Sequence, residues 1–149
     1  LMSHLGRPKG FDNNLSMSKI HSEVEKVLNT KVILSKDIVG DDAINKAKNL
    51  SKGEVLLLEN LRFHKEETDG DAGFAKKLSS IADCYVNDAF GTAHRAHAST
   101  TIIAQFFENK FFGSLLEKEV KSIEKVMKSG EKQACHPSLW MNRLKEAEE

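Results

Sequence analysis

The sequence predicts an α/β fold: a three-layer, Rossmann-like parallel sheet with helices on both faces. Three short apolar runs, at residues 31–34, 55–58 and 84–86, have the length of buried strands. Segments whose apolar residues recur at helical spacing lie between them. Each strand is followed by a helix and another strand within about 30 residues, the size of a βαβ unit. Such alternation is typical of a parallel sheet covered by helices.

The helical segments are amphipathic and lie between or after the strands. Their apolar residues fall at helical spacing in four places, residues 20–28, 44–50, 74–81 and 114–128. Ser16 or Ser18 is expected to be the N-cap of the first helix. The second is entered through Gly40-Asp41-Asp42. These two aspartates, and the pair Glu66-Glu67, are typical of helix starts or of solvated loops.

Composition excludes several classes of protein. The chain has 149 residues and a formal net charge of zero from 22 basic and 22 acidic residues. A nucleic-acid-binding protein usually carries a basic excess, so nucleic acid is not an expected partner. No apolar run has the length of a membrane span and no signal-peptide pattern is present, so no membrane association is expected. Cys84 and Cys135 lie far apart and predict a reducing, cytoplasmic environment without a disulfide framework.

Two parts of the chain differ in character. Residues 1–132 follow the strand–helix pattern and are expected to form one partial domain. Residues 133–149 contain the only Trp and do not continue that pattern, so they are expected to be an aberrant tail that adds no strand. The chain opens on apolar residues with no Met at position 1, so residues 1–4 are interpreted as the end of a strand that begins upstream.

Three polar clusters follow three of the predicted strands, at residues 3–10, 59–64 and 87–97. Each cluster carries one arginine: Arg7, Arg62 or Arg95. Ligands of parallel α/β sheets bind beyond the carboxyl ends of the strands, and a guanidinium group presents a planar fork of donors to phosphate and carboxylate oxygens. The three arginines are therefore expected to converge on one small anion of two or three charges. Gly6 and Gly91 would allow tight turns and a close approach of the backbone.

Other interpretations of single residues remain open at this point. Arg62 could pair with Glu66 or Glu67 on the surface, and His64 is expected to face solvent. His94 and His97 could suggest a metal, but two histidines three residues apart need further ligands, so no metal site is predicted. The glycines form neither a G-x-G-x-x-G nor a Walker A pattern, so no nucleotide-binding loop is predicted.

The three clusters resemble those of the phosphoglycerate kinase family. The matching segments are SHLGRP at residues 3–8, LLLENLRFHKEE at 56–67 and, longest and most specific, YVNDAFGTAHRAHAS at 85–99. The resemblance covers about residues 1–132, most of the N-terminal domain of that family. Members transfer a phosphoryl group reversibly between 1,3-bisphosphoglycerate and ADP in glycolysis, giving 3-phosphoglycerate and ATP. Their N-terminal domain binds the phosphoglycerate, and their C-terminal domain binds the Mg-nucleotide.

The resemblance implies roles for individual residues. It makes this chain a member of a phosphotransferase family whose acceptor is a carboxyl group, and it suggests a monomer. Carried over position by position, the substrate-binding residues are His4, Leu5, Gly6, Arg7, Arg62, Gly91 and Arg95. No catalytic or nucleotide-binding residue carries over.

The sequence also departs from the family. The family's opening strand with its Arg-x-Asp-x-Asn segment, the C-terminal domain with its Gly-Gly-x-Lys segment, and a match to the tail are all absent. The chain is therefore expected to bind phosphoglycerate at most, to bind no Mg-ADP or Mg-ATP, and to be inactive alone. The alternatives are a non-catalytic anion-binding α/β module and an unrelated flavodoxin-like domain whose basic loops bind another phosphate.

Overall fold

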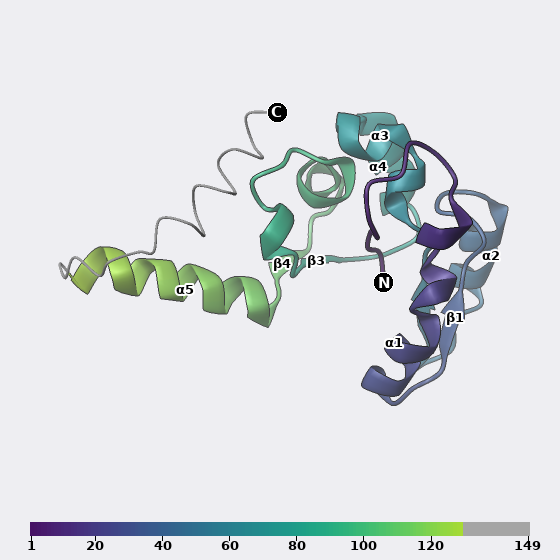
Figure 1. The fold of residues 1–149 in the computed structure, drawn as a ribbon, viewed down its shortest axis with the longest axis horizontal. Coiled ribbons are helices and arrows are strands. Elements are labelled where there is room, and N and C mark those ends of the chain that lie inside the picture. Colours follow the sequence, from purple (N-terminus) through teal and green to yellow (C-terminus); the bar gives the residue numbers. More distant parts are fainter. Residues whose placement is uncertain (130–149) are drawn as a thin grey trace.

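The computed structural model describes residues 1–129, and its strands form two parallel pairs (Figure 1). In one pair β1 (Val32–Leu34) lies beside β2 (Val55–Leu57), and in the other β3 (Tyr85–Asn87) lies beside β4 (Lys110–Phe112). The α/β class with parallel strands is confirmed, and the first three strands fall where the sequence predicts them. Within residues 1–129, however, the pairs form two separate sheets rather than one continuous sheet. The predicted tail, residues 133–149, lies outside the described residues.

The opening residues run along the free edge of β2. The Leu58 N–H donates to the Leu1 carbonyl at 2.9 Å, and the Leu61 N–H donates to the Ser3 carbonyl at 3.2 Å. The Leu1 amino group donates to the Leu56 carbonyl. Leu1 thus bonds to the residues on both sides of Leu57, the pattern of a parallel pair. The segment predicted to be a strand end is extended and paired with β2, although it is not a regular strand.

Five helices accompany the strands among the described residues: α1 (His21–Leu28), α2 (Asp41–Lys48), α3 (Lys65–Asp69), α4 (Ala72–Ser79) and α5 (Ser114–Ser129). The four amphipathic helices expected from the sequence are present, and Asp41 and Asp42 lie in the first turn of α2. The predicted N-cap of α1 is wrong. Ser16 caps a 3-10 turn, Met17–Lys19, and the N-cap of α1 is Ile20, which makes no side-chain hydrogen bond there.

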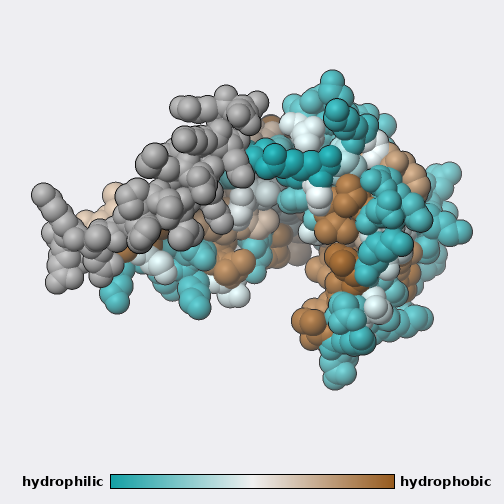
Figure 2. Space-filling model, viewed as in Figure 1, coloured by the Kyte–Doolittle hydropathy of each residue, from teal (hydrophilic) through white to brown (hydrophobic). Residues whose placement is uncertain are grey.

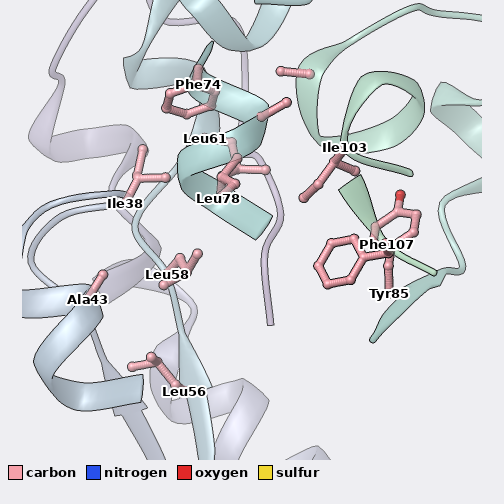
Figure 3. Packing of buried hydrophobic residues seen from close by; sticks show 12 residues of the cluster. Ile38, Ala43, Leu56, Leu58, Leu61, Phe74, Leu78, Tyr85, Ile103 and Phe107 are labelled. Atoms are coloured by element: carbon pink, nitrogen blue, oxygen red, sulfur yellow. The ribbon is translucent and has the colours of Figure 1, made fainter. Parts of the chain in front are cut away.

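The main core lies between the two strand pairs (Figure 3). Leu56 and Leu58 approach it from the β2 side, and Tyr85 and Phe107 approach it from the β3 side, where their rings stack at 5.8 Å. A smaller cluster centred on Met17 packs on the outer side of β2. Apolar burial therefore joins the two halves even though no described strand bridges them. No helix in residues 1–129 is long and apolar enough to cross a membrane.

Candidate anion-binding site

The carboxyl ends of β2 and β3 open on one cleft of about 380 Å³. Its lining residues are basic, small or hydroxylated: His4, Gly6, Arg7, Arg62, Gly91, Thr92, His94 and Arg95. Six of the seven predicted site residues thus lie around a single cavity, with Thr92 and His94 in addition. Three loops from distant parts of the sequence supply these residues. The fold therefore gathers several basic side chains in one place, although the formal net charge of the chain is zero.

Leu5 is the predicted site residue that does not line this cleft. Its side chain packs against the smaller apolar cluster of Met17, Val32 and Leu57. Its carbonyl accepts a hydrogen bond from Asn60 Nδ2 at 2.8 Å. Leu5 therefore helps to fix the path of the loop that carries His4 and Arg7, and its partly buried side chain packs against this cluster.

Arg62 occupies the centre of the site because a short turn after β2 presents it there. The Asn60 side chain accepts from the Arg62 backbone N–H at 3.1 Å and caps the 3-10 turn Leu61–Phe63. One terminal nitrogen of the guanidinium donates to the Gly6 carbonyl at 2.9 Å. Its Nε atom is buried and has no hydrogen-bond partner within residues 1–129. A buried donor without an acceptor is costly.

Glu66 and Glu67 bond to other residues instead of forming the surface ion pair with Arg62 that the sequence left open. Glu66 lies with its carboxylate 3.8 Å from His64 Nδ1. Glu67 is buried and accepts hydrogen bonds from Ser99. The His64 side chain is 40% exposed, so it faces solvent in part, while its ring stacks on Phe74 at 5.2 Å.

Like charges in the cleft repel one another. Burial, followed by the neighbouring charges of Arg95 and Arg7, lowers the pKa of Arg62, and only Glu67 acts in the opposite direction. Burial, followed by Arg62 and Arg95, also lowers the pKa of His4. The imidazole of His4 is therefore held neutral near pH 7, where it can donate one hydrogen bond and accept another. A negative ligand would relieve this repulsion.

The loop that carries Arg7 is shaped by Gly6 and by a buried carboxylate. Gly6 has φ +64°, and a Cβ added there would lie 2.9 Å from the Leu15 side chain, so both backbone and space favour glycine. Glu59 follows β2 and accepts from Ser16 Oγ, the Met17 N–H and the Asn60 N–H, each at 2.7 Å. These bonds hold residues 5–17 against the end of β2.

The loop that carries Arg95 is held by a second buried carboxylate, Glu67. It accepts from Ser99 Oγ at 2.6 Å and from the Ser99 N–H at 3.0 Å. His97 Nδ1 lies 3.8 Å away. Burial raises the pKa of Glu67, and the Ser99 hydrogen bonds partly offset this. The sequence placed Glu67 at a helix start or in a solvated loop, or on the surface beside Arg62. The five-residue helix α3 is too short to show the periodicity that would mark Glu67 as buried.

Gly91 and the histidines complete the rim. Gly91 does not have a positive φ, and a Cβ added there would meet nothing within 4 Å. Gly91 lies in the 3-10 turn Phe90–Thr92, whose backbone does not require glycine at this position, and its missing side chain leaves that wall of the cleft open. His94 Nε2 accepts from Arg95 Nε at 3.2 Å. Nowhere in residues 1–129 do three or more His, Cys, Asp or Glu side chains gather as metal ligands.

The fold and the cleft define an α/β domain of parallel strands with a cationic pocket at the strand ends. A family model described as phosphoglycerate kinase matches residues 1–136. The chain therefore belongs to the phosphoglycerate kinase family, as the three sequence clusters predict.

Individual relatives agree with this assignment. A phosphoglycerate kinase of Porphyromonas gingivalis is 47% identical over 150 residues, covering 84% of this chain and 36% of that protein. One of Dictyoglomus turgidum is 46% identical over 132 residues, covering 89% of this chain and 33% of that protein. The crystal structure of phosphoglycerate kinase from Pyrococcus horikoshii is similar with a TM-score of 0.74 at 32% identity, covering 87% of this chain and 33% of that one. The chain spans about a third of the length of these relatives.

Proposed function

We propose that the cleft binds phosphoglycerate and supplies the acceptor side of the kinase reaction. The observation that carries the proposal is the convergence of Arg7, Arg62 and Arg95 with His4 around one cavity. Three guanidinium groups match a ligand with a phosphate and a carboxylate, since both groups accept bidentate hydrogen bonds. The reaction would be the reversible transfer of a phosphoryl group between 1,3-bisphosphoglycerate and ADP, giving 3-phosphoglycerate and ATP.

Within this proposal each residue has a distinct part. Arg62 lines the cleft and brings a positive charge to the ligand, and its position is set by the hydrogen bond to Gly6. Arg7 and Arg95 approach from the loops on either side, so they orient the ligand by its two charged ends. The neutral imidazole of His4 offers a hydrogen bond without adding to the repulsion. Phosphoryl transfer depends mainly on such positioning and on electrostatic stabilisation.

The Mg-nucleotide does not fit the residues described here. Residues 1–129 offer neither a glycine-rich phosphate loop nor a group of acidic side chains that could hold a cation. We therefore expect purified chain to show no turnover with ADP and 1,3-bisphosphoglycerate in a coupled assay. Turnover above the uncatalysed background that is abolished by Arg62→Ala would contradict this expectation.

Substitution of Arg95 tests the binding proposal directly. Arg95→Ala removes one charged donor from the cleft and should weaken 3-phosphoglycerate binding by about 10- to 100-fold, because a hydrogen bond to a charged group contributes about 1.5–3 kcal/mol. The measurement is calorimetric titration of the chain. Lys52→Ala is the matched control, because Lys52 is an exposed cation in the turn before β2, at the amino end of the strand. Equal affinity of the Arg95→Ala variant and the unchanged chain would refute the assignment.

A further inference from the structure

Asn60 is a fully buried polar residue that stands two positions before Arg62 in the chain. Its side-chain amide both donates and accepts hydrogen bonds. Nδ2 donates to the carbonyls of Leu5 and Leu15, each at 2.8 Å, and Oδ1 accepts from the Arg62 N–H at 3.1 Å. Buried amides are normally paired, but these partners belong to the turn after β2 and to two separate positions of the opening loop. The amide therefore joins segments that lie far apart in the sequence.

The bonds to Leu5 and Leu15 close the base of the loop that carries Arg7. Both carbonyls meet the same nitrogen, so the chain leaves and returns at one point. The two ends of the loop are also close in space, because a Cβ added at Gly6 would lie 2.9 Å from the Leu15 side chain. An amide suits this position, because its NH2 group has two donors for two carbonyls, whereas an ionised carboxylate of the same size has none.

The same loop is tied to the turn after β2 at two adjacent residues. The Asn60 amide bonds to the Leu5 carbonyl. The next carbonyl, that of Gly6, accepts from the Arg62 guanidinium at 2.9 Å. Asn60 also caps the 3-10 turn that presents Arg62. Arg7 follows the tied pair directly in the chain. The position of Arg7 relative to Arg62 therefore depends on the Asn60 amide.

Arg95 reaches the cleft from the other half of the molecule. Its loop follows β3 and is held by Glu67 through Ser99, and the space-filling view shows a hollow between the two halves (Figure 2). The side-chain bonds of Asn60 go to the opening loop and to the turn after β2. Asn60 is not among the residues that line the cleft. It therefore acts from behind one side of the cleft, the side that carries Arg7.

We propose that Asn60 is a positioning residue for the anion and acts through Arg7. By closing the base of the loop, its amide keeps the Arg7 guanidinium at one place in the cleft, where it binds the anion together with Arg62. A loop open at its base would spread Arg7 over many positions and lower its effective concentration at the bound anion. Binding groups need such support from surrounding hydrogen bonds to keep their geometry. The anion is taken to be phosphoglycerate, so the inference rests on the proposed function.

A double-mutant cycle in 3-phosphoglycerate binding tests whether Asn60 acts through Arg7. Asn60→Ser keeps a hydroxyl that can cap the Arg62 turn and loses the NH2 group that closes the loop. Calorimetric titration should show about tenfold weaker binding for this variant. Added to Arg7→Ala, the same substitution should weaken binding by less than about threefold, because the group that it positions is already gone. Added to Arg95→Ala, it should again weaken binding by about tenfold.

Two results of this cycle would overturn the proposal. Equal further losses in the Arg7→Ala and Arg95→Ala backgrounds would show that Asn60 supports only the general stability of the chain. Unchanged affinity of Asn60→Ser would show that it has no part in binding. Ile38→Val is the control, because it removes a buried methyl group from the main core and should change the affinity by less than about twofold. If the unchanged chain does not bind 3-phosphoglycerate, the proposed function fails first and the role of Asn60 fails with it.

A second measurement needs no substitution at Asn60. By linkage, a ligand whose affinity depends on a closed loop must favour the closed loop by the same factor. At saturation, 3-phosphoglycerate should therefore slow the solvent exchange of the Asn60 Nδ2 hydrogens by about tenfold, which NMR can follow. In Arg7→Ala at the same occupancy, the slowing should be less than about threefold. Equal slowing in the two chains would contradict the proposal, even if Asn60→Ser fails to fold.

Discussion

Two buried glutamates hold the two sides of the cationic cleft in different ways. Glu59, just after β2, holds the loop that carries Arg7, and Glu67, in α3, holds the loop that carries Arg95. Both are almost fully buried, with exposed fractions of 7% and 3%. A buried carboxylate is tolerated only when hydrogen bonds replace its hydration, so each is also a constraint on the loop that supplies its donors.

The two glutamates differ in how many residues they join. Glu59 accepts from Ser16, Met17 and Asn60, and the Asn60 amide adds bonds to the carbonyls of Leu5 and Leu15, each at 2.8 Å. The Arg7 loop is therefore fixed at several points.

Within residues 1–129, Ser99 is the only residue that donates hydrogen bonds to the Glu67 carboxylate. The Ser99 carbonyl in turn accepts from the Tyr85 hydroxyl at 2.8 Å. It also lies beside the imidazole of His97. Burial, followed by the charge of Glu67, raises the pKa of Tyr85 to about 12, so that hydroxyl remains a donor at any physiological pH. The comparison teaches that the carboxylate on one side of the cleft is bonded by three residues, whereas the carboxylate on the other side is bonded by one serine and lies beside titratable groups.

The largest effect is expected from loss of the Glu59 carboxylate. Glu59→Ala leaves three donors without their charged acceptor and should lower the free energy of unfolding by about 3–5 kcal/mol. Urea unfolding measures this change. Glu23→Ala is the control, because Glu23 is a highly exposed partner of Lys26 and its loss should cost less than about 1 kcal/mol. If the two variants are equally stable, the Glu59 network does not hold the Arg7 loop.

A smaller and more local effect is expected from Glu67. Glu67→Ala removes both Ser99 bonds and should cost about 2–3 kcal/mol. Amide exchange should accelerate in residues 97–102, where the loop meets the helical turn that begins at Ala98, and should be little changed in residues 5–17. Ser99→Ala removes one of the two bonds and should give an intermediate result. Faster exchange around both arginine loops would show that the two walls are coupled, contrary to the comparison.

The smallest effect is a pH dependence that arises from His97, on the Arg95 side of the cleft, and in part from His4. Burial, followed by Arg62 and Arg95, lowers the pKa of His97 below its unfolded value. The unfolded chain then binds more protons than the folded chain as pH falls through about 6.5, so stability decreases from pH 8 to pH 6. Glu67 has the opposite effect, because its pKa is raised in the folded chain, so the folded state is stabilised as pH falls toward the pKa that Glu67 has in the unfolded chain. That stabilisation develops nearer pH 4.5, below the range in which the histidines titrate.

Urea unfolding at pH 8 and pH 6 checks this sign. His97→Asn should reduce the loss of stability between the two pH values, with the remainder arising from His4, whose pKa is lowered by the same causes. A chain that becomes more stable at pH 6 would show that the carboxylate outweighs the imidazoles.

The sequence predicted the parts of the molecule that local pattern determines. Strand positions follow from apolar runs, and the three arginines could be placed together because parallel strands share a carboxyl edge. The roles of Glu59 and Glu67 could not be predicted, because their partners lie about 43 and 32 residues away. β4 was missed because its three residues are all exposed and show no alternation. The division into two strand pairs depends on tertiary placement, which periodicity does not report.

The pairing of the opening segment with β2 also bears on the order of folding. The hydrogen bonds from Leu1 to Leu56 and from Asn60 to Leu5 each close a loop of 55 residues. Such closure loses chain entropy before any contact compensates for it, and contacts of high sequence separation slow folding. Local units such as α3 with α4 can form without that loss. We therefore expect the Arg7 side of the cleft to assemble late, on a β2 strand that is already in place.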